Sequence, residues 1–192
     1  NHENIHRVAL ERIYPDHTSF YAIIPDSYSE VFAAELKGVE ESTRLFDLGG
    51  EAVIEVGDQK FEERYGAVAD SNFFDVFKFE ILQGAAPDQA LTKPNTIVLT
   101  QSAAKRFFKS ENPIGKSLKT FGLDFEVTAI MEDLPDNSHL KFEFLFASAS
   151  FPDLELENFT GFSGFNYLKL NPGIDPLTVE SQIPSLVDKY AS

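Results

Sequence analysis

Short segments in which apolar and polar residues alternate dominate this chain and predict many β-strands. The clearest is residues 123–131, in which Phe125, Val127 and Ala129 occupy every second position. The segment TIVLT at residues 96–100 is almost wholly apolar, which also favours a strand. Strands are expected at residues 5–14, 41–48, 52–56, 60–69, 79–82, 96–100, 118–120, 123–131, 142–146 and 165–170.

Helices are fewer, and each is marked by residues suited to its first turn. Ser27 with Glu30 three residues later forms a capping box, and Gly38 is a suitable stop. Thr100 can cap a second helix, and Pro176 suits the first turn of the last one. Helices are expected at residues 26–37 and 101–108 and from 175 towards 191, with a short helical turn at 71–77. Strands and helices alternate along the chain rather than forming a run of either, and no repeat of fixed period is visible; we interpret this pattern as an α+β fold.

Composition is that of a globular protein. The 192 residues are 43% hydrophobic and 13% aromatic, enough to bury a core as one domain or two small ones. Lys and Arg number 16 against 31 Asp and Glu, and the resulting charge of -15 would repel a nucleic-acid backbone or an anionic membrane surface. Cysteine is absent, which excludes disulfides, thiol catalysis and cysteine-ligated zinc. No apolar run approaches the roughly 18 residues of a membrane span.

Residues 2–6 spell HENIH and match the H-E-x-x-H pattern of zinc proteases. Such a site needs both histidines on one face of an ordered helix, a third ligand downstream and a glutamate that polarises the bound water. Here the motif runs into a strand-like stretch, in which His2 and His6 would lie roughly 13 Å apart, too far to bind one ion. His17 and His139 show no metal-ligand spacing. We therefore expect no metal, no cofactor and no protease chemistry.

Two polar segments could contribute to a functional site, but a turn is the simpler interpretation of each. In NPIGK, Gly115 and Lys116 could form an anion nest, but the surrounding glycines of a phosphate loop are missing. Asp133 precedes the turn-forming segment LPDNSH and Asp136 lies within it, so both are expected to be loop carboxylates rather than a catalytic pair. A calcium site there would lack the one-three-five spacing of oxygen ligands. No catalytic residue is predicted from either segment.

Phenylalanines supply both the expected core and the weak site candidates. Phe107, about one turn after a pair of small alanines, and Phe74 are predicted to anchor the core. In NFTGFSGFNY, Phe159, Phe162 and Phe165 are spaced by small residues. These three could form a mobile hydrophobic lip that contacts a partner or an apolar substrate, and packing beneath a loop is the alternative.

Four phrases of the sequence together carry a resemblance to a known family. They are DSNFFDVFKFEILQG, ALTKPNTIVLTQSAAKRFFKSENPIGKSL, FEVTAIMEDLPDNSHLKFEFLFAS and NYLKLNPGID, which follow one another over roughly residues 70 to 175. In order and spacing they resemble the extracytoplasmic core domain of MacB/FtsX-type ABC transporter permeases. One phrase alone would be weak evidence for the family. Four phrases in the same order, after a fitting N-terminal strand, are specific evidence for it. The resemblance covers nearly the whole chain.

The resemblance implies a non-catalytic domain between the first and second transmembrane helices of a permease, on the far side of the membrane from the ATPase. ATP hydrolysis would move it and so push, release or activate a periplasmic substrate. The implied partners are the flanking transmembrane helices, a second permease copy, the cytoplasmic ATPase and a periplasmic adaptor or substrate, with no nucleic acid. The implied location is the periplasmic side of the inner membrane of a Gram-negative bacterium. A start at Asn1 rather than Met is then expected of an excised piece.

Two alternatives stay open at this point. A free-standing periplasmic binding module could share the fold, and its gene would encode a cleavable signal and a stop codon instead of flanking apolar spans. A zinc metallopeptidase would require hydrolysis that His2→Ala abolishes.

The resemblance also implies a mixed α+β subdomain interrupted by a second, mainly β subdomain. Because two membrane helices would bring both chain ends to one side, residues 1–48 and 141–192 are expected to form the membrane-proximal α+β subdomain. Residues 49–140 are expected to be the insertion, with its own apolar core. The turn-rich residues 48–50 and 134–139 mark the crossings and are the expected hinge.

Overall fold

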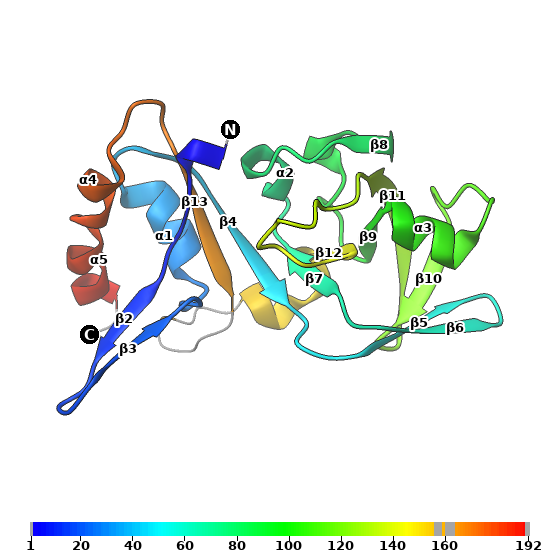
Figure 1. The fold of residues 1–192 in the computed structure, drawn as a ribbon, viewed down its shortest axis with the longest axis horizontal. Helices are drawn as coiled ribbons and strands as arrows, with labels where there is room; N and C mark the ends of the chain where they lie inside the picture. Colours follow the sequence, from blue (N-terminus) through cyan, green and yellow to red (C-terminus); the bar gives the residue numbers. More distant parts are fainter. Residues whose placement is uncertain (1, 156–158, 160–163, 191–192) are drawn as a thin grey trace. The chain divides into compact units, whose positions relative to one another are not determined.

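The structure is a computed structural model that describes residues 2–155, 159 and 164–190. Its fold is α+β, as predicted, with a large mixed sheet and few helices (Figure 1). The chain divides into two compact units. The terminal unit comprises Asn1–Leu45 and Leu156–Ser192, and the central unit comprises Phe46–Glu155. No helix in the described ranges is both long and apolar enough to span a membrane.

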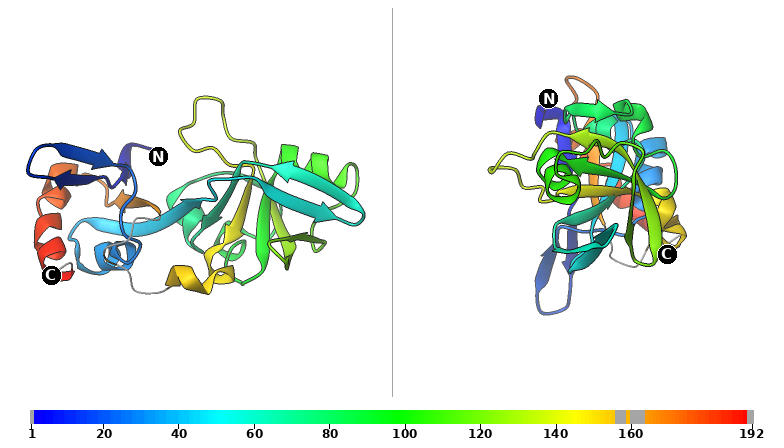
Figure 2. Two further views of the ribbon diagram at one scale, coloured as in Figure 1. Left: turned by 90° about the horizontal axis from the view of Figure 1, so that it is seen from below. Right: turned by 90° about the vertical axis from the view of Figure 1, so that its right-hand side faces the viewer.

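The terminal unit is built on a sheet with the strand order β1-β13-β4, antiparallel throughout. Its elements are η1 (His2–Asn4), β1 (Ile5–Arg7), β2 (Leu10–Ile13), β3 (Thr18–Tyr21), α1 (Tyr28–Glu35), β4 (Val39–Asp47), β13 (Phe165–Leu170), α4 (Pro176–Glu180) and α5 (Ile183–Tyr190). β2 and β3 form a separate two-stranded sheet, which projects from the unit as a hairpin in both Figure 1 and Figure 2. The central strand of this unit, β13, therefore contacts both the first strand of the chain and β4.

Helices α1, α4 and α5 bury their apolar sides against β13. Leu168 and Leu170 lie two positions apart on β13 and therefore share the face that the helices cover. Phe32 of α1 and Leu36 just after it lie four positions apart, so both reach that face. The buried cluster comprises Ile24, Tyr28, Phe32, Leu36, Leu168, Leu170, Val179 and Leu186. This core holds the last two helices to the sheet.

The central unit contains a mixed sheet with the strand order β7-β12-β9-β11-β10-β5-β6. Its elements are β5 (Ala52–Val56), β6 (Gln59–Glu63), β7 (Gly66–Ala69), α2 (Phe73–Val76), β8 (Ile81–Gly84), η2 (Pro87–Gln89), β9 (Thr96–Thr100), α3 (Gln101–Phe108), β10 (Ser117–Thr120), β11 (Leu123–Met131), β12 (Phe144–Ala147), η3 (Ser148–Ser150) and η4 (Pro152–Glu155). Two pairings, β12 with β7 and β11 with β9, are parallel. The end of β11 also pairs with β8.

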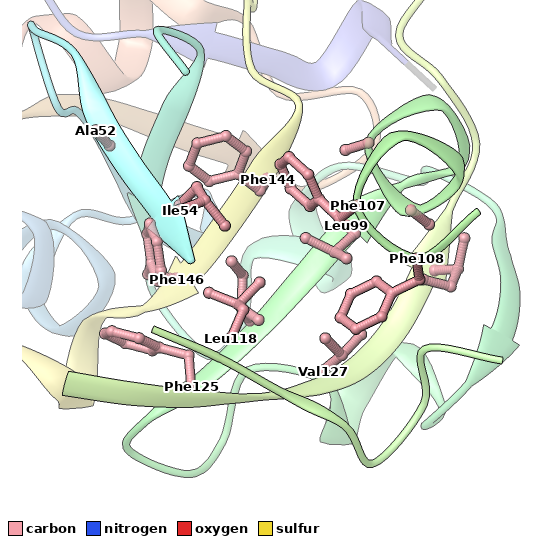
Figure 3. Close-up of a cluster of buried hydrophobic side chains, with 14 of the residues drawn as sticks. Ala52, Ile54, Leu99, Phe107, Phe108, Leu118, Phe125, Val127, Phe144 and Phe146 are labelled. Atoms are coloured by element: carbon pink, nitrogen blue, oxygen red, sulfur yellow. The ribbon is translucent and has the colours of Figure 1, made fainter. Parts of the chain in front are cut away.

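Aromatic residues fill the core of the central unit. Figure 3 shows Phe107 and Phe108 of α3 packed towards side chains of the sheet, among them Phe144 and Phe146 of β12. Phe107 and Phe74 are each 2% exposed, which confirms their predicted burial. Phe74 belongs to a second aromatic group, formed by the phenylalanines at positions 73, 74, 77, 79 and 142.

One glycine allows β8 to approach β11 closely. Gly84 lies opposite Ala129 and has a φ of +99°. A Cβ atom at this position would lie 2.3 Å from the carbonyl oxygen of Thr128. Gly57, in the β5–β6 turn, also has a positive φ, of +56°, but nothing lies within 4 Å of its hypothetical Cβ. The first glycine is needed for space as well as for its φ, and the second only for its φ.

Charges of alternating sign run across four strands at the β6 edge of the central sheet. Lys60 lies opposite Glu55, Glu55 opposite Lys119, and Lys119 opposite Asp124. Lys60 and Glu55 form an ion pair at 2.7 Å. Opposite charges in directly paired positions favour this strand register over a shifted one.

Several predicted elements match the structure residue for residue, namely the strands at 52–56, 96–100, 123–131 and 165–170 and the helix at 101–108. The predicted turn at Gly57 and Asp58 joins β5 to β6. Thr100 caps α3 as expected, because its Oγ1 accepts a hydrogen bond from the N–H of Ala103 at 3.3 Å. These elements are specified by residues close together in the sequence.

Other predictions were wrong in detail. The strand expected at 5–14 is two strands, because Val8 is the last residue that bonds to β13 and β2 then pairs with β3. The strand expected at 60–69 is likewise two, β6 and β7, which pair with different neighbours. Ser27 lies at the N-cap of α1 but makes no side-chain capping bond there. The last helix is interrupted between α4 and α5.

Residues 141–155 lie in the central unit, whereas the predicted layout placed them with the chain ends. The reason is β12, which pairs with β7 on one side and β9 on the other. Both chain ends belong to the terminal unit. The division into a membrane-proximal and an inserted subdomain, with its hinge, stays a prediction.

Candidate functional site

Helix α5 is fastened to α1 by a group of polar contacts, here called the helix clamp, made by Glu35, Lys189 and Tyr190. Lys189 Nζ donates to both carboxylate oxygens of Glu35 at 2.8 Å. The Tyr190 hydroxyl donates to Glu35 Oε1. The hydrogen bond from Lys189, followed by that from Tyr190, lowers the pKa of Glu35, and the same ion pair raises the pKa of Lys189. The carboxylate therefore keeps its charge to a lower pH than a glutamate without these partners.

A second contact fixes the start of α5. Gln182, in the turn before α5, accepts a hydrogen bond from the N–H of Lys37 at 3.0 Å and donates one to the carbonyl of Lys37 at 3.1 Å. Lys37 follows the end of α1. Both ends of α5 are thus bonded to the α1 region, and Leu186 between them is buried in the core. The two hydrogen-bonded ends and the buried Leu186 together attach α5 to α1 and the core.

The first strand of the chain is joined to the same body. β1 pairs with β13 over its whole length, from Ile5 opposite Lys169 to Arg7 opposite Tyr167. The guanidinium of Arg7 also lies 5.9 Å from the ring centre of Phe165. Burial raises the pKa of the Tyr167 hydroxyl, and the nearby Arg7 partly offsets this. The first strand and the last helix of the chain, β1 and α5, are therefore both anchored on β13 and its helices.

The central unit has an open groove of about 370 Å³ beside the start of α3. Its lining includes Asp133, whose carboxylate accepts hydrogen bonds from the N–H and the hydroxyl of Ser102 at 2.8 and 2.7 Å. Burial alone would raise the pKa of Asp133, but these bonds and one from the Thr100 hydroxyl outweigh burial and lower it. Asp133 thus holds the first turn of α3 against the loop that lines the groove.

One arginine joins three elements near this groove. Arg106 of α3 donates to both carboxylate oxygens of Glu63 in β6, at 2.8 Å each, and also to Glu143, which lines the groove. Glu63 is buried and Arg106 is partly exposed. The arrangement fixes α3 to β6 and to the segment before β12. We read it as a structural bridge, because both carboxylates are engaged by the same guanidinium.

The residues singled out as a hydrophobic lip are only partly described. Phe159 lies against Tyr28, with ring centres 5.2 Å apart, and stacks on Tyr190 at 5.0 Å. Phe165 lies in β13, half-buried. Phe162 lies outside the described residues. A role of these three residues in partner contact stays a prediction.

The HENIH segment does not form the helix of a zinc protease. Residues His2–Asn4 form a short 3₁₀ turn and Ile5–Arg7 form β1, so His6 belongs to a paired strand. Across the described ranges, no three His, Asp or Glu side chains gather closely enough to hold a metal ion. At Gly115 and Lys116, the amides donate to the carbonyls of Val127 and Pro113 at 2.9 Å, so Gly115 is bonded to β11 and Lys116 closes a turn.

The helix clamp and the Arg106 bridge could not be found from the sequence. Glu35 and Lys189 are far apart along the chain, and neither lies in a local motif. Arg106 with Glu63 and Glu143 presents the same difficulty. Only the Thr100 cap gave a signal, because it predicted the helix at residues 101–108, which carries Arg106.

Comparison with known proteins places these features in a family context. The family model described as MacB-like periplasmic core domain matches residues 3–186. No individually curated protein matches the sequence at a meaningful level. The match covers nearly all of the described chain, including β1 and the first half of α5.

Solved structures of similar fold come from several bacteria. A domain of a protein described as a permease from Porphyromonas gingivalis is 22% identical, with a TM-score of 0.87, covering 98% of this chain and 82% of that one. The periplasmic region of MacB from Actinobacillus actinomycetemcomitans is 17% identical, with a TM-score of 0.69, over 88% and 75%. The extracellular domain of the ABC-type transporter YknZ from Gram-positive bacteria is 14% identical, with a TM-score of 0.65, over 98% and 96%. At these identities the likeness concerns the fold.

Proposed function

Because the chain belongs to the family of MacB-like periplasmic core domains, we propose that it transmits ATP-driven motion of an ABC transporter permease to a substrate or partner outside the cytoplasm. Family membership makes it the extracytoplasmic domain of a MacB-type permease. The transmission of motion is our inference. In this role the domain performs no chemistry itself, and ATP is hydrolysed by a separate domain or subunit on the other side of the membrane.

The observation that carries the proposal is the joint anchoring of β1 and α5. A displacement at either chain end reaches β13, through the β1 pairing at one end and through the packed helices at the other. The helix clamp adds a bond between α5 and α1 that a sliding helix would have to break. A body held in this way follows a pull as a unit, which is what transmission of motion requires.

The proposed partners follow from the permease setting. They are the flanking transmembrane helices of the same protein, a second permease copy, the cytoplasmic ATPase and a periplasmic adaptor or substrate. Nucleic acid is not among them, given the charge of -15. A Gram-negative inner membrane is the proposed location, although one structure of similar fold comes from Gram-positive bacteria.

A distance measurement on the full-length permease with its ATPase, in lipid nanodiscs, tests the proposal. The 192 residues contain no cysteine, so Leu177→Cys introduces a unique label position within the domain, at a side chain 68% exposed in α4. Spin labels at this position in two copies should show a distance distribution that differs between the ATP-bound and nucleotide-free states. An ATPase variant unable to bind ATP is the control. Identical distributions in all nucleotide states would overturn the proposal.

The helix clamp offers a second arm of the same experiment. Lys189→Glu should shrink the ATP-dependent change in distance without lowering ATP hydrolysis, because α5 loses its bond to Glu35. The double variant Glu35→Lys with Lys189→Glu restores an opposite-charge pair and should restore the change. A double variant no better than the single one would show that the clamp does not carry the motion.

A further inference from the structure

An apolar groove runs beside the first strand of the terminal unit. Its volume is about 280 Å³, and its lining includes Arg7, Val8, Leu168, Val179, Glu180 and Ile183. Leu168 and Val179 are buried and form its floor, whereas Arg7 and Glu180 are exposed. The groove therefore has an apolar floor from β13 and α4, and charged residues at its margin. Apolar grooves of this kind accept side chains of a bound polypeptide or ligand.

Along β1, at the edge of this groove, some backbone groups have no bonding partner among the described residues. Val8 donates its N–H to the carbonyl of Asn166 at 2.9 Å, and His6 lies opposite Leu168 in the same register. Backbone groups of successive residues alternate in direction across an antiparallel pair, so those of Ile5 and Arg7 point away from β13. Within the described part of the chain, β1 ends the sheet and pairs on one side only. An edge of this kind is a template for another strand.

Arg7 determines which side chain would suit such a strand. Its guanidinium contacts the ring of Phe165 and the hydroxyl of Tyr167, and no carboxylate among the described residues pairs with it. A strand added in antiparallel orientation would place one residue opposite Arg7, on the face away from the helices. The residues on either side of it would face the groove. The matching pattern is one acidic residue between two apolar residues.

We propose that β1 and this groove bind an extended segment of a partner protein, which adds an antiparallel strand to the sheet with an acidic residue opposite Arg7 and apolar neighbours in the groove. Backbone hydrogen bonds to Arg7 would supply affinity, and the groove and the guanidinium would supply selectivity. The inference goes beyond the mechanical role and does not depend on it, because the binding is measured on the 192-residue chain without membrane or ATPase.

Fluorescence anisotropy with end-capped, fluorescein-labelled peptides tests the inference. The probe is Ser-Thr-Val-Asp-Val-Thr-Ser, and its partner probe carries Lys in place of Asp. The chain should bind the Asp peptide about tenfold more tightly than the Lys peptide, and Arg7→Glu should reverse this order. Arg12→Glu is the matched control, because Arg12 also lies over an aromatic ring, that of Tyr14, but away from the groove. It should leave the order unchanged.

Methylation of single peptide nitrogens tests the strand geometry. Methylating the Asp nitrogen removes the donor aimed at the carbonyl of Arg7 and should weaken binding about tenfold. Methylating the nitrogen of the second Val, which would point away from β1, is the control and should change little. The Arg7 amide should also exchange with solvent more slowly in the presence of the peptide, whereas the His6 amide, already directed at β13, should not change.

Three outcomes would each overturn the inference. One is no anisotropy change with the Asp peptide at concentrations up to about 1 mM. A specific short peptide is expected to have a dissociation constant below this concentration. Another is that the Asp and Lys peptides bind equally well to the wild-type chain and also equally well to the Arg7→Glu variant. The third is binding without slower exchange of the Arg7 amide, which would place the peptide elsewhere. A domain that binds the peptide but shows no ATP-dependent motion would support this inference while refuting the proposed function.

Discussion

Lys189 in α5 and Glu35 in α1 form a bidentate ion pair, with both nitrogen–oxygen distances at 2.8 Å. The Tyr190 hydroxyl donates to the same carboxylate. Three polar groups from the two helices therefore meet at one place, close to where the described chain ends. The charge of Glu35 is therefore one of the contacts that hold α5, together with the Gln182 bonds and the buried Leu186.

Acid should loosen α5. The pKa of Glu35 is lower in the folded chain than in the unfolded one, so its carboxylate stabilises the fold above the ordinary pKa of about 4.3 and loses this effect as the pH falls through the folded value. Hydrogen exchange of the α5 amides, corrected for intrinsic rates, should rise below about pH 4. Glu35→Gln should show the faster exchange already at pH 7. Glu30→Gln, on the same helix, is the control, and an equal effect of both would contradict the prediction.

Removal of a core ring should destabilise the chain strongly. Phe74→Ala and Phe107→Ala should each lower the free energy of unfolding by about 3–5 kcal/mol, because each ring is buried and leaves a cavity. Urea denaturation followed by circular dichroism measures the loss. Phe20→Ala removes the same ring from a side chain 74% exposed and should cost little. Losses below about 1 kcal/mol at both buried positions would mean that these rings are not core anchors.

Two glycines with positive φ should respond differently to alanine. Gly84→Ala places a methyl group against the backbone of β11 and should cost about 2–4 kcal/mol in the free energy of unfolding. Gly57→Ala meets open space and should cost only the strain of its φ, about 1 kcal/mol. Denaturation of the two variants in parallel gives the comparison. Equal losses would show that the close approach of β8 to β11 does not limit the side chain.

Loss of the arginine bridge should leave a buried carboxylate without its partner. Arg106→Leu should lower the free energy of unfolding by about 1–3 kcal/mol, less than for a fully buried pair because Arg106 is partly exposed. Adding Glu63→Gln, which removes the uncompensated charge, should recover part of the loss. If the second change only adds to the first, the destabilisation arises from lost packing of Arg106 instead.

The chain should bind neither ATP nor DNA. Its charge of -15 repels phosphates, and the amides of Gly115 and Lys116 are directed at protein carbonyls. Calorimetric titration at physiological salt should show no heat of binding for either ligand. Micromolar affinity for a nucleotide would refute this expectation and reopen the question of a phosphate site.

Sequence patterns predicted elements better than they predicted neighbours. The β9–α3 unit was predicted to the residue, because the apolar run and the Thr100 cap act within a few positions of each other. The pattern around Phe144 and Phe146 predicted a strand but not that it would lie between β7 and β9. Strand order depends on contacts between distant segments, for which alternation gives no signal.

The residues of the candidate site were even harder to predict from the sequence than the order of the strands. The helix clamp joins Glu35 to residues near the opposite end of the sequence, and surface charges of this kind look alike in a sequence. The groove beside β1 depends on β13 and α4, which follow the whole central unit. The HENIH letters, by contrast, suggested a site that the paired strand at His6 does not form. The match of these letters to a motif therefore said less about the role of His6 than the strand pairing does.

The pairing of Ile5 with Lys169 has a consequence for the order of folding. The central unit draws all its strands from one continuous stretch, Phe46–Glu155, so it can bury its core as soon as that stretch is synthesised. β1 and β4 emerge earlier but find their shared neighbour, β13, only afterwards. Closing so long a loop is easier when the intervening residues are already compact, because fewer conformations are then lost. We therefore expect the body that joins the two ends to form last, and a chain that stalls before β13 to expose an unpaired first strand.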